Sequence, residues 1–302
     1  MDPNRRALLA AAALAPLARA GAARSRGPAP VPRISLAEWS FHRALRSGAL
    51  AHLDFAAHAK KEYGLEGVEY VNQFFADKGA DFAYLSEMKK RASDAGVQSL
   101  LIMVDGEGSL GAADLAERRT AIENHFRWIA AAAYLGGHSV RVNAAGSGTR
   151  EEHAKQAAES LHRLAVVADR YGLNVIVENH GGLSSDGAWL AGVMKLADHP
   201  RVGTLPDFGN FSLGEGKSYD RYLGTQELIP FAKALSAKSY DFDDQGNETT
   251  IDYFKMAKIA TAAGYPGWVG VEYEGDRLSE ADGVRKTIDL VRRAWSQAGE
   301  AK

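Results

Sequence analysis

The 302-residue sequence contains no cysteine and no large excess of charge of either sign. The lack of cysteine excludes disulfides, thiolate metal ligands and a cysteine nucleophile, so the chain is indifferent to the redox state of its compartment. With a net charge of −2, the sequence offers no basic surface to hold nucleic acid. No P-loop occurs, and no glycine-rich phosphate turn follows the first predicted strand. These absences argue against nucleic-acid partners and nucleotide cofactors.

A long hydrophobic run is also missing, because the apolar stretch 7–18 is too short to span a bilayer as a stable helix. An arginine pair (5–6) precedes this stretch, and an A-x-A sequence (18–20) ends it. This order is typical of a secretory signal, and the paired arginines resemble the twin-arginine export type. An alanine-rich arm with a chance arginine pair is the alternative. We expect an export signal and linker over 1–30, a folded domain over 31–302, and a periplasmic or secreted protein with no stable membrane insertion.

Eight short β-prone runs recur along the chain, each followed by a stretch of helical periodicity. Their ends lie roughly 30 to 40 residues apart, which suits one strand–helix–strand unit each time. The sequence therefore predicts a single-domain α/β fold, the (β/α)8 TIM barrel. A doubly wound open sheet is the alternative, but such a sheet usually has fewer units. The predicted strands are 33–38, 65–70, 97–103, 139–143, 174–179, 202–207, 234–238 and 268–272, and the clearest helices are 112–135, 151–171, 250–263 and 279–298.

Charged or amide side chains stand at or just past the C-terminal end of nearly every predicted strand. Strand bodies such as 175–177 are apolar by contrast. Active sites of TIM barrels lie at these C-terminal ends, so we expect a polar pocket there. The residues concerned are Glu38, Glu69, Asp105, Arg141, Asn143, Glu178, His180, Asp207, Asn210, Lys238, Tyr240, Glu272 and Glu274.

Carboxylates that converge from neighbouring strands repel one another unless a cation, a shared proton or a paired Lys or Arg offsets the cost. Glu178, Asp207 and Glu272 are the foremost carboxylates of the expected pocket. Oxygen ligands of this kind suit a divalent Mn²⁺ or Mg²⁺ ion. A structural network with Arg141 and Lys238 would satisfy them equally, and the sequence leaves both interpretations open.

Three strand-end motifs resemble those of the xylose-isomerase-like sugar isomerase/epimerase superfamily. They are Val-Glu-Asn (177–179), Leu-Pro-Asp-Phe-Gly-Asn (205–210) and Val-Glu-Tyr-Glu (271–274). The resemblance covers residues 33–297 and implies a barrel that acts on a small carbohydrate. The superfamily also includes endonuclease IV relatives, which need several histidines for three metals and a basic DNA face. The predicted strand ends offer no such set of histidines, and the net charge of −2 offers no basic face.

The resemblance also implies roles for the three carboxylates. In the epimerase branch, the residues matching Glu178 and Glu272 bind a divalent metal and move a proton on opposite faces of the substrate. The residue matching Asp207 is a third metal ligand. The branch supplies a histidine from the seventh strand as a fourth ligand, where this chain aligns Ser236. His180 is the candidate substitute ligand.

Lys238 shares the side-chain parity of Ser236 in an extended strand, so we expect both side chains to face the pocket. A protonated lysine does not bind a metal, but it can stabilise an enolate, and Lys238 joins Glu178 and Glu272 as a predicted catalytic residue. The predicted substrate-binding residues are Glu69, Arg141, Asn143, His180, Asn210 and Tyr240.

These residues predict abstraction of a proton next to a carbonyl, with an enediolate held by a metal or by Lys238. Epimerisation and isomerisation are two outcomes of this chemistry. A periplasmic lyase or hydratase that acts on keto-sugars or 3-keto-glycosides by β-elimination is a third. A barrel that binds carbohydrate without turnover stays open as a different class, and so does assembly into a homo-oligomer.

Overall fold

The computed structural model describes residues 32–300, and the predicted export signal and linker (1–30) lie outside them. Eight strands form one parallel sheet in the order β6–β5–β4–β3–β2–β1–β10–β9. They are β1 (Arg33–Ala37), β2 (Gly67–Val71), β3 (Gln98–Met103), β4 (Ser139–Val142), β5 (Asn174–Glu178), β6 (Val202–Leu205), β9 (Leu235–Ser239) and β10 (Trp268–Tyr273). All eight predicted strands are confirmed, and each ends within two residues of its expected C-terminal end.

The seam between β6 and β9 closes the ring without a regular ladder. Isolated parallel bridges join Thr204 to Ala232 and Asp207 to Ser236. Ser236 donates its backbone N–H to the carbonyl of Pro206, at 3.0 Å, and its own carbonyl accepts from Phe208, at 3.1 Å. The backbone contacts that close the ring thus lie at the C-terminal end of β6, where the predicted pocket lies.

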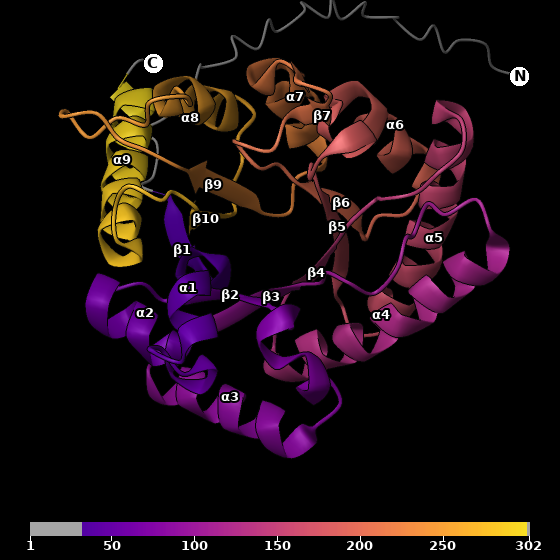
Figure 1. Ribbon diagram of the computed structural model, residues 1–302, viewed down its shortest axis with the longest axis horizontal. Coiled ribbons are helices and arrows are strands. Elements are labelled where there is room, and N and C mark those ends of the chain that lie inside the picture. The colour runs from indigo at the N-terminus through magenta and orange to yellow at the C-terminus, as the bar shows by residue number, and fades with distance from the viewer. Residues whose placement is uncertain (1–31, 301–302) are drawn as a thin grey trace, which may run out of the picture.

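Helices surround the strands on the outside, as Figure 1 shows, and the α/β barrel fold is confirmed. Each helix from α3 to α8 begins at an aspartate or threonine whose side chain accepts a backbone N–H of the first turn. The helices are α1 (His42–Ser47), α2 (Phe55–Tyr63), α3 (Phe82–Asp94), α4 (Leu115–Leu135), α5 (Arg150–Asp169), α6 (Gly187–Ala197), α7 (Arg221–Leu228), α8 (Tyr253–Ala262) and α9 (Glu280–Glu300).

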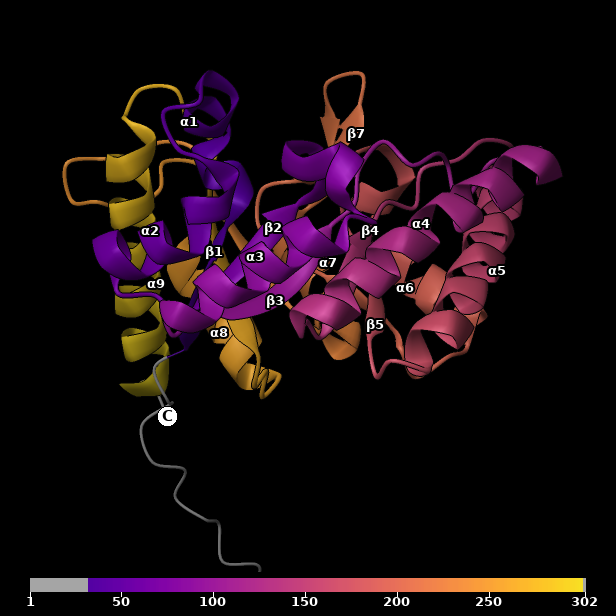
Figure 2. The same cartoon turned by 90° about the horizontal axis from the view of Figure 1, so that it is seen from below.

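A small antiparallel hairpin follows β6 and was not predicted. Its strands are β7 (Ser212–Gly214) and β8 (Lys217–Ser218), and they pair only with each other. Figure 2 shows the hairpin projecting beyond the end of the barrel at which the strands finish, here called the mouth. Strands of three and two residues are too short for an alternating pattern to be recognised in the sequence.

The apolar core has two parts, because alternate strand residues face the helices and the barrel interior. Most of the buried apolar side chains pack between the strands and the helices. A smaller cluster fills the interior, and Trp39 and Phe74 pack against it. Its members are Ala37, Val71, Leu101, Met103, Ile176, Leu205 and Ala234. This apolar layer supports the polar side chains of the mouth.

Within the described residues, no helix is long and apolar enough to cross a membrane.

Trp128 on α4 is the largest fully buried side chain. Its indole N–H donates to Glu107 Oε1 at 2.7 Å, and its ring meets Phe75 edge to face at 5.2 Å between centroids. Gly79 lies directly against this ring, where a Cβ atom would come within 2.8 Å of it. The absence of a side chain at Gly79 is what makes room for the indole.

We therefore expect Gly79→Ala to lower the free energy of unfolding by about 1 to 3 kcal/mol, the usual cost of overpacking a core. The backbone of Gly79 has a φ of −58°, so the cost comes from the ring and not from the backbone. Gly192→Ala on α6 is the matched control, because no atom lies within 4 Å of its added Cβ. Urea unfolding of both variants checks the prediction, and equal stabilities would contradict it.

Candidate active site

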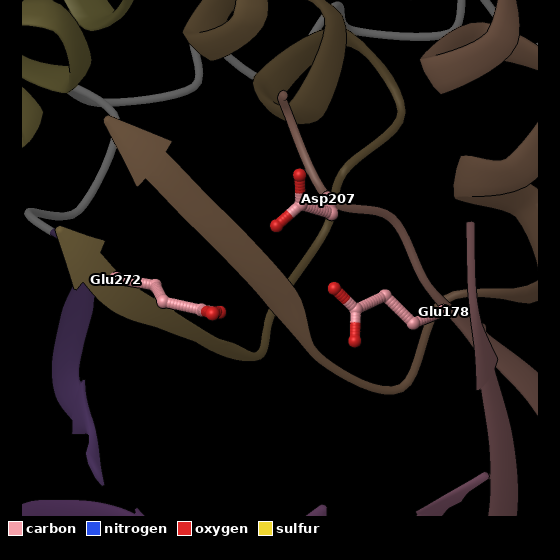
Figure 3. Close-up of side chains that lie close together, drawn as sticks. All are labelled: Glu178, Asp207 and Glu272. Atoms are coloured by element: carbon pink, nitrogen blue, oxygen red, sulfur yellow. The ribbon is translucent and has the colours of Figure 1, made fainter. Parts of the chain in front are cut away.

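Three buried carboxylates meet at the mouth of the barrel. Glu178 is the last residue of β5, Asp207 follows β6, and Glu272 lies near the end of β10. One carboxylate oxygen of each lies within 4.8 Å of the other two. Figure 3 shows Glu178 and Glu272 facing each other from opposite sides, with Asp207 between them. The structure therefore brings together the three residues that the strand motifs singled out.

Each of the two opposed glutamates has its own buried cation. Arg141 Nε lies 2.9 Å from Glu178 Oε2, and Lys238 Nζ lies 2.7 Å from Glu272 Oε1. The ammonium group of Lys238 also lies 3.0 Å from Glu274 Oε2 and 4.0 Å from Asp207 Oδ2. Both cations stand on inward-facing positions of β4 and β9, which is why the barrel closure brings them to the carboxylates.

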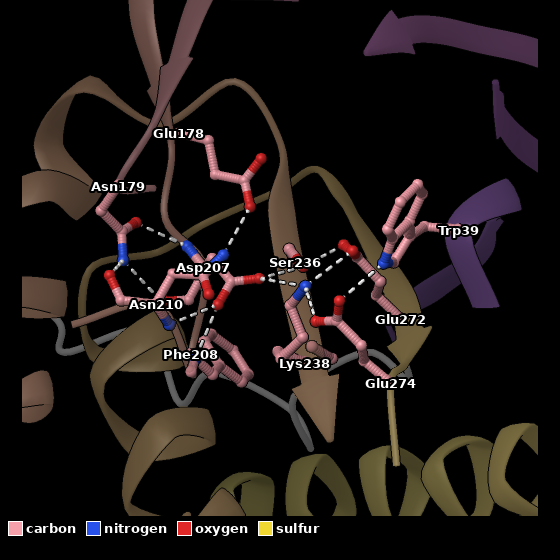
Figure 4. Close-up of polar contacts among 12 residues, drawn as sticks. Trp39, Glu178, Asn179, Asp207, Phe208, Asn210, Ser236, Lys238, Glu272 and Glu274 are labelled. Atoms are coloured by element: carbon pink, nitrogen blue, oxygen red, sulfur yellow. Dashed lines mark hydrogen bonds and ion pairs between the residues drawn. The ribbon is translucent and has the colours of Figure 1, made fainter. Parts of the chain in front are cut away.

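Asp207 is held by hydrogen bonds from its own loop and from the neighbouring strand (Figure 4). Its Oδ1 accepts the backbone N–H groups of Gly209 and Asn210 at 2.7 and 2.8 Å. Ser236 Oγ lies 2.6 Å from Asp207 Oδ2 and 3.0 Å from Glu272 Oε2, so one hydroxyl bridges the two carboxylates. The amide of Asn210 donates to Glu178 Oε1 at 3.0 Å.

Burial and charge act on these groups in opposite directions. Burial raises the pKa of Glu178, against the lowering effect of Arg141, and burial likewise raises the pKa of Asp207 against Lys238. Burial also disfavours the charge of Lys238, but the surrounding carboxylates, Glu272 foremost, prevail and raise its pKa well above the ordinary value. The mouth therefore combines a permanently charged ammonium with carboxyl groups that bind a proton more readily than in water.

The cluster of carboxylates has the donors and the charge to hold a hard divalent cation. The three carboxylates and the hydroxyl of Ser236 are oxygen ligands, the type that such ions prefer. With Glu274 and Asp105 nearby, carboxylates outnumber the two buried cations, so an ion would reduce the repulsion. The ammonium of Lys238 would in turn repel that ion and weaken its binding.

The remaining predicted substrate-binding residues surround this centre at different depths. Asn143 donates to Asp105 Oδ1 at 2.7 Å, and the same oxygen accepts from Arg141 at 2.6 Å. His180 is exposed at the rim. Tyr240 is half buried, and its hydroxyl lies close to Gly209, at which a Cβ would come within 2.7 Å of it.

Four residues take a larger part in this network than the sequence indicated. Asp105 and Glu274 stand at strand ends, but no pattern told which cation each would pair with. Trp39 donates its indole N–H to Glu274 Oε1 at 2.7 Å, so Glu274 links the aromatic side chain to Lys238. Asn179 fixes the loop of Asp207 by donating to its carbonyl at 2.9 Å and accepting its N–H at 2.8 Å. The sequence signal for these four residues was their position at or just after the end of a predicted strand.

Glu69 lies deeper than the other predicted residues and does not join the triad. It is 1% exposed, its Oε1 accepts from Ser35 Oγ at 2.6 Å, and its Oε2 has no hydrogen-bond partner among the described residues. A Cβ at Gly270 would come within 2.6 Å of this carboxyl group, so the glycine of β10 provides its space. Burial, with a smaller contribution from Glu272 and Glu178, raises the pKa of Glu69 to about 8.

This pKa predicts that Glu69 makes the fold less stable as the pH rises. The folded state keeps the proton up to about pH 8, whereas the unfolded chain releases it near the ordinary value of 4.5, so unfolding is favoured progressively between these values. Glu69→Gln removes the titration. We expect its advantage over the natural protein to grow by a few kcal/mol from pH 5 to pH 8, since one pKa unit corresponds to about 1.4 kcal/mol.

Urea unfolding at several pH values measures this difference. Glu123→Gln on the exposed face of α4 is the control and should run parallel to the natural protein at every pH. A constant difference between Glu69→Gln and the natural protein would show that Glu69 does not titrate in this range.

Comparison with known proteins adds a curated relative and a set of solved folds. The alpha subunit of a C-glycoside deglycosidase from Arthrobacter globiformis is 31% identical over 78 residues, which are 24% of this chain and 22% of that protein. The match thus spans about a fifth of the length of that relative.

The similar structures cover almost the whole chain at low identity. A 3-keto-D-glucoside 4-epimerase from E. coli superposes with a TM-score of 0.67 at 16% identity, over 87% of this chain and 99% of that one. The IOLI protein, solved with a bound zinc atom, gives a TM-score of 0.68 at 12% identity, over 88% and 98%. At these identities the likeness shows the fold.

The family is shown by the sequence itself. The model of the xylose isomerase-like TIM barrel matches residues 57–294, most of the chain and all but the first of its barrel strands. The strand-end motifs and the closed parallel barrel agree with that match. This chain belongs to the xylose isomerase-like TIM barrel family, and its fold is that of the sugar isomerases and epimerases.

Proposed function

We propose that the protein is an enzyme that abstracts a proton next to the carbonyl of a keto-sugar. The observation that carries the proposal is the pair of opposed glutamates, Glu178 and Glu272, each with its own cation and with Asp207 between them. Two proton-transfer groups on opposite sides of one small space suit a planar enediolate with a face toward each. A purely structural network would not require two such ion pairs to face each other.

The proton transfer follows from the environment of the two glutamates. A substrate C–H next to a carbonyl lies between them, one carboxylate takes the proton, and the carbonyl oxygen gains negative charge. The ammonium of Lys238, held 2.7 Å from Glu272, is close enough to donate a hydrogen bond to that oxygen. The opposite carboxyl group then delivers a proton to the other face, which gives the epimer.

The substrate class is supported by the names of two similar proteins. The E. coli structure is a 3-keto-D-glucoside 4-epimerase, and the curated relative is a C-glycoside deglycosidase subunit. We propose a keto-sugar that carries a substituent, such as a 3-keto-glycoside. The half-buried Trp39 and Phe74, with ring centroids 6.1 Å apart at the rim, are placed to pack against a sugar or its substituent.

Elimination is a second candidate outcome of the same proton abstraction, favoured by the deglycosidase relative. After the proton leaves, the electron pair of the broken C–H bond forms a carbon–carbon double bond, and the group on the β-carbon departs with its bonding electrons. A carboxyl group that binds a proton readily, as Glu178 does, can protonate the departing group as its bond to the β-carbon breaks. The products distinguish the outcomes, because epimerisation keeps the substituent and elimination releases it.

A divalent cation is part of the proposal, with Glu178, Asp207 and Glu272 as its ligands. Such an ion would supply a Lewis acid that polarises the substrate carbonyl. Arg141 and Ser236 would then orient the ligands, because they already contact Glu178, Asp207 and Glu272. The bound zinc of the IOLI structure supports an ion in this family fold.

The proton abstraction predicts exchange with solvent. In D₂O, we expect a 3-keto-glucoside to gain deuterium at the carbon next to its carbonyl when the protein is present, as measured by proton NMR and mass spectrometry. Glu178→Gln and Glu272→Gln should each slow the exchange about 100-fold or more, because each removes one acid or base.

Two results would count against this assignment. Exchange that survives both substitutions would remove the glutamates from the chemistry, and keto-sugar binding without any exchange would identify a carbohydrate-binding barrel. Glu123→Gln on α4 is the matched control and should leave the rate unchanged.

The ligand set predicts how single substitutions change metal affinity. We expect Asp207→Asn to weaken Mn²⁺ binding at least about tenfold, because one negative ligand is lost, and Lys238→Met to strengthen it by about tenfold, because an ammonium 4.0 Å from Asp207 is removed. Calorimetric titration of the metal-free protein measures both, with the exposed Asp244→Asn as the control. A natural protein that takes up no divalent metal by elemental analysis or titration would contradict the ligand assignment.

A further inference from the structure

A cavity lies at the end of the barrel opposite to the mouth, where the strands begin. Its volume is about 630 Å³. The first residues of four strands line it, namely Arg33, Gln98, Asn174 and Trp268. The proposed chemistry uses none of these residues.

The charged groups of this cavity have one sign. Arg33, Lys89 and Lys233 line it, and no aspartate or glutamate is among the lining residues. His138 lines it as well, but burial and the nearby Arg33 lower the pKa of its imidazole, so it adds no positive charge near neutral pH. The mouth shows the opposite composition, since its carboxylates outnumber its cations. Grouped cations without a carboxylate repel one another, and this repulsion is relieved when an anion lies between them.

Two of the three cations are free to contact a ligand. Lys89 is engaged, because its Nζ donates to the carbonyl of Tyr134 near the end of α4, at 2.7 Å. Across residues 32–300, neither Arg33 nor Lys233 forms an ion pair with an acidic side chain. The guanidinium of Arg33 lies 4.8 Å from the centre of the Trp268 ring, so the indole holds it at the cavity wall.

Polar groups from the far side of the ring complete the lining. The ring of His138 is part-buried just before β4, with its Nδ1 2.7 Å from Ser139 Oγ. Asn174 donates to the carbonyl of His138 at 2.9 Å and thereby fixes the loop that carries it. Lys233 precedes β9 at the seam of the barrel, where its backbone N–H donates to Thr204 at 3.0 Å. An anion in this cavity would therefore lie among the residues that precede β4 and β9 and the first residues of β1 and β10.

We propose that this cavity binds a small molecule with two or more oxyanion groups, either phosphates or carboxylates. A stacked guanidinium presents paired N–H donors that match the oxygens of either group. A volume of about 630 Å³ is in the range of small-molecule sites and exceeds the needs of a single inorganic ion. Because the ligand would bridge the starts of β1, β4 and β9, its binding stabilises the closed ring.

Thermal unfolding of the full chain tests the site with two probes, inorganic phosphate and citrate, each titrated against sodium chloride at equal ionic strength. We expect at least one probe to raise the Tm by about 2 °C or more in a saturable manner. A response to phosphate alone assigns a phosphate ligand, and a response to citrate alone assigns a polycarboxylate. No saturable rise with either probe would overturn the proposal.

Substitutions locate the effect. Arg33→Gln and Lys233→Gln should each weaken the apparent affinity about tenfold or more, since each removes a charged donor. Arg170→Gln and Lys258→Gln are the matched controls, because both are exposed cations outside the cavity. Lys233→Gln keeps the Arg33–Trp268 contact, so a weaker affinity in this variant cannot result from a folding defect caused by the loss of that contact. Equal responses in the variants and the controls would refute the site.

The deuterium exchange of keto-sugars should be unchanged in Arg33→Gln and Lys233→Gln, because the cavity and the mouth lie at opposite ends of the barrel. The two proposals can therefore fail separately.

Discussion

The mouth of this barrel depends on one ammonium group. Lys238 contacts Glu272 and Glu274 and lies 4.0 Å from Asp207, so a single positive charge serves three carboxylates that would otherwise repel one another. Lys238 is 2% exposed, and such a charge is stable only because these partners surround it. The ammonium group that offsets the repulsion between these carboxylates is also the group placed to stabilise an enediolate. Structure and proposed chemistry thus share one side chain.

The seam of the barrel determines where that ammonium lies. β9 meets the end of β6 through the bridge between Asp207 and Ser236, and Lys238 stands two residues further along β9. The hydroxyl of Ser236 contacts the carboxylates of both Asp207 and Glu272. Side-chain hydrogen bonds therefore cross the seam at the same place as the backbone bridge. An irregular seam leaves the loop after β6 free to turn its carboxylate inward, where Asn179 and two backbone N–H groups hold it.

The strands and the strand-end carboxylates could be predicted because both obey short-range rules: apolar runs of fixed length, and polar residues where a run ends. Glu178, Asp207 and Glu272 are of this kind. The pairing of Lys238 with Glu274 could not be predicted, because it depends on the register between β9 and β10, which places Lys238 opposite Glu272. The deep burial of Glu69 could not be predicted either, because it depends on the missing side chain of Gly270 on another strand.

The two proposed sites lie at opposite ends of the barrel axis and carry opposite charge. Inward positions at the strand ends carry carboxylates, whereas positions at the strand beginnings carry Arg33 and the neighbouring Lys233, and the net charge of −2 conceals this separation. An apolar interior layer that includes Leu101 and Ile176 lies between the two ends and keeps the opposite charges apart. If they met, they would neutralise one another as ordinary ion pairs. Separated, the acidic end is suited to a cation and a proton, and the basic end to an anion.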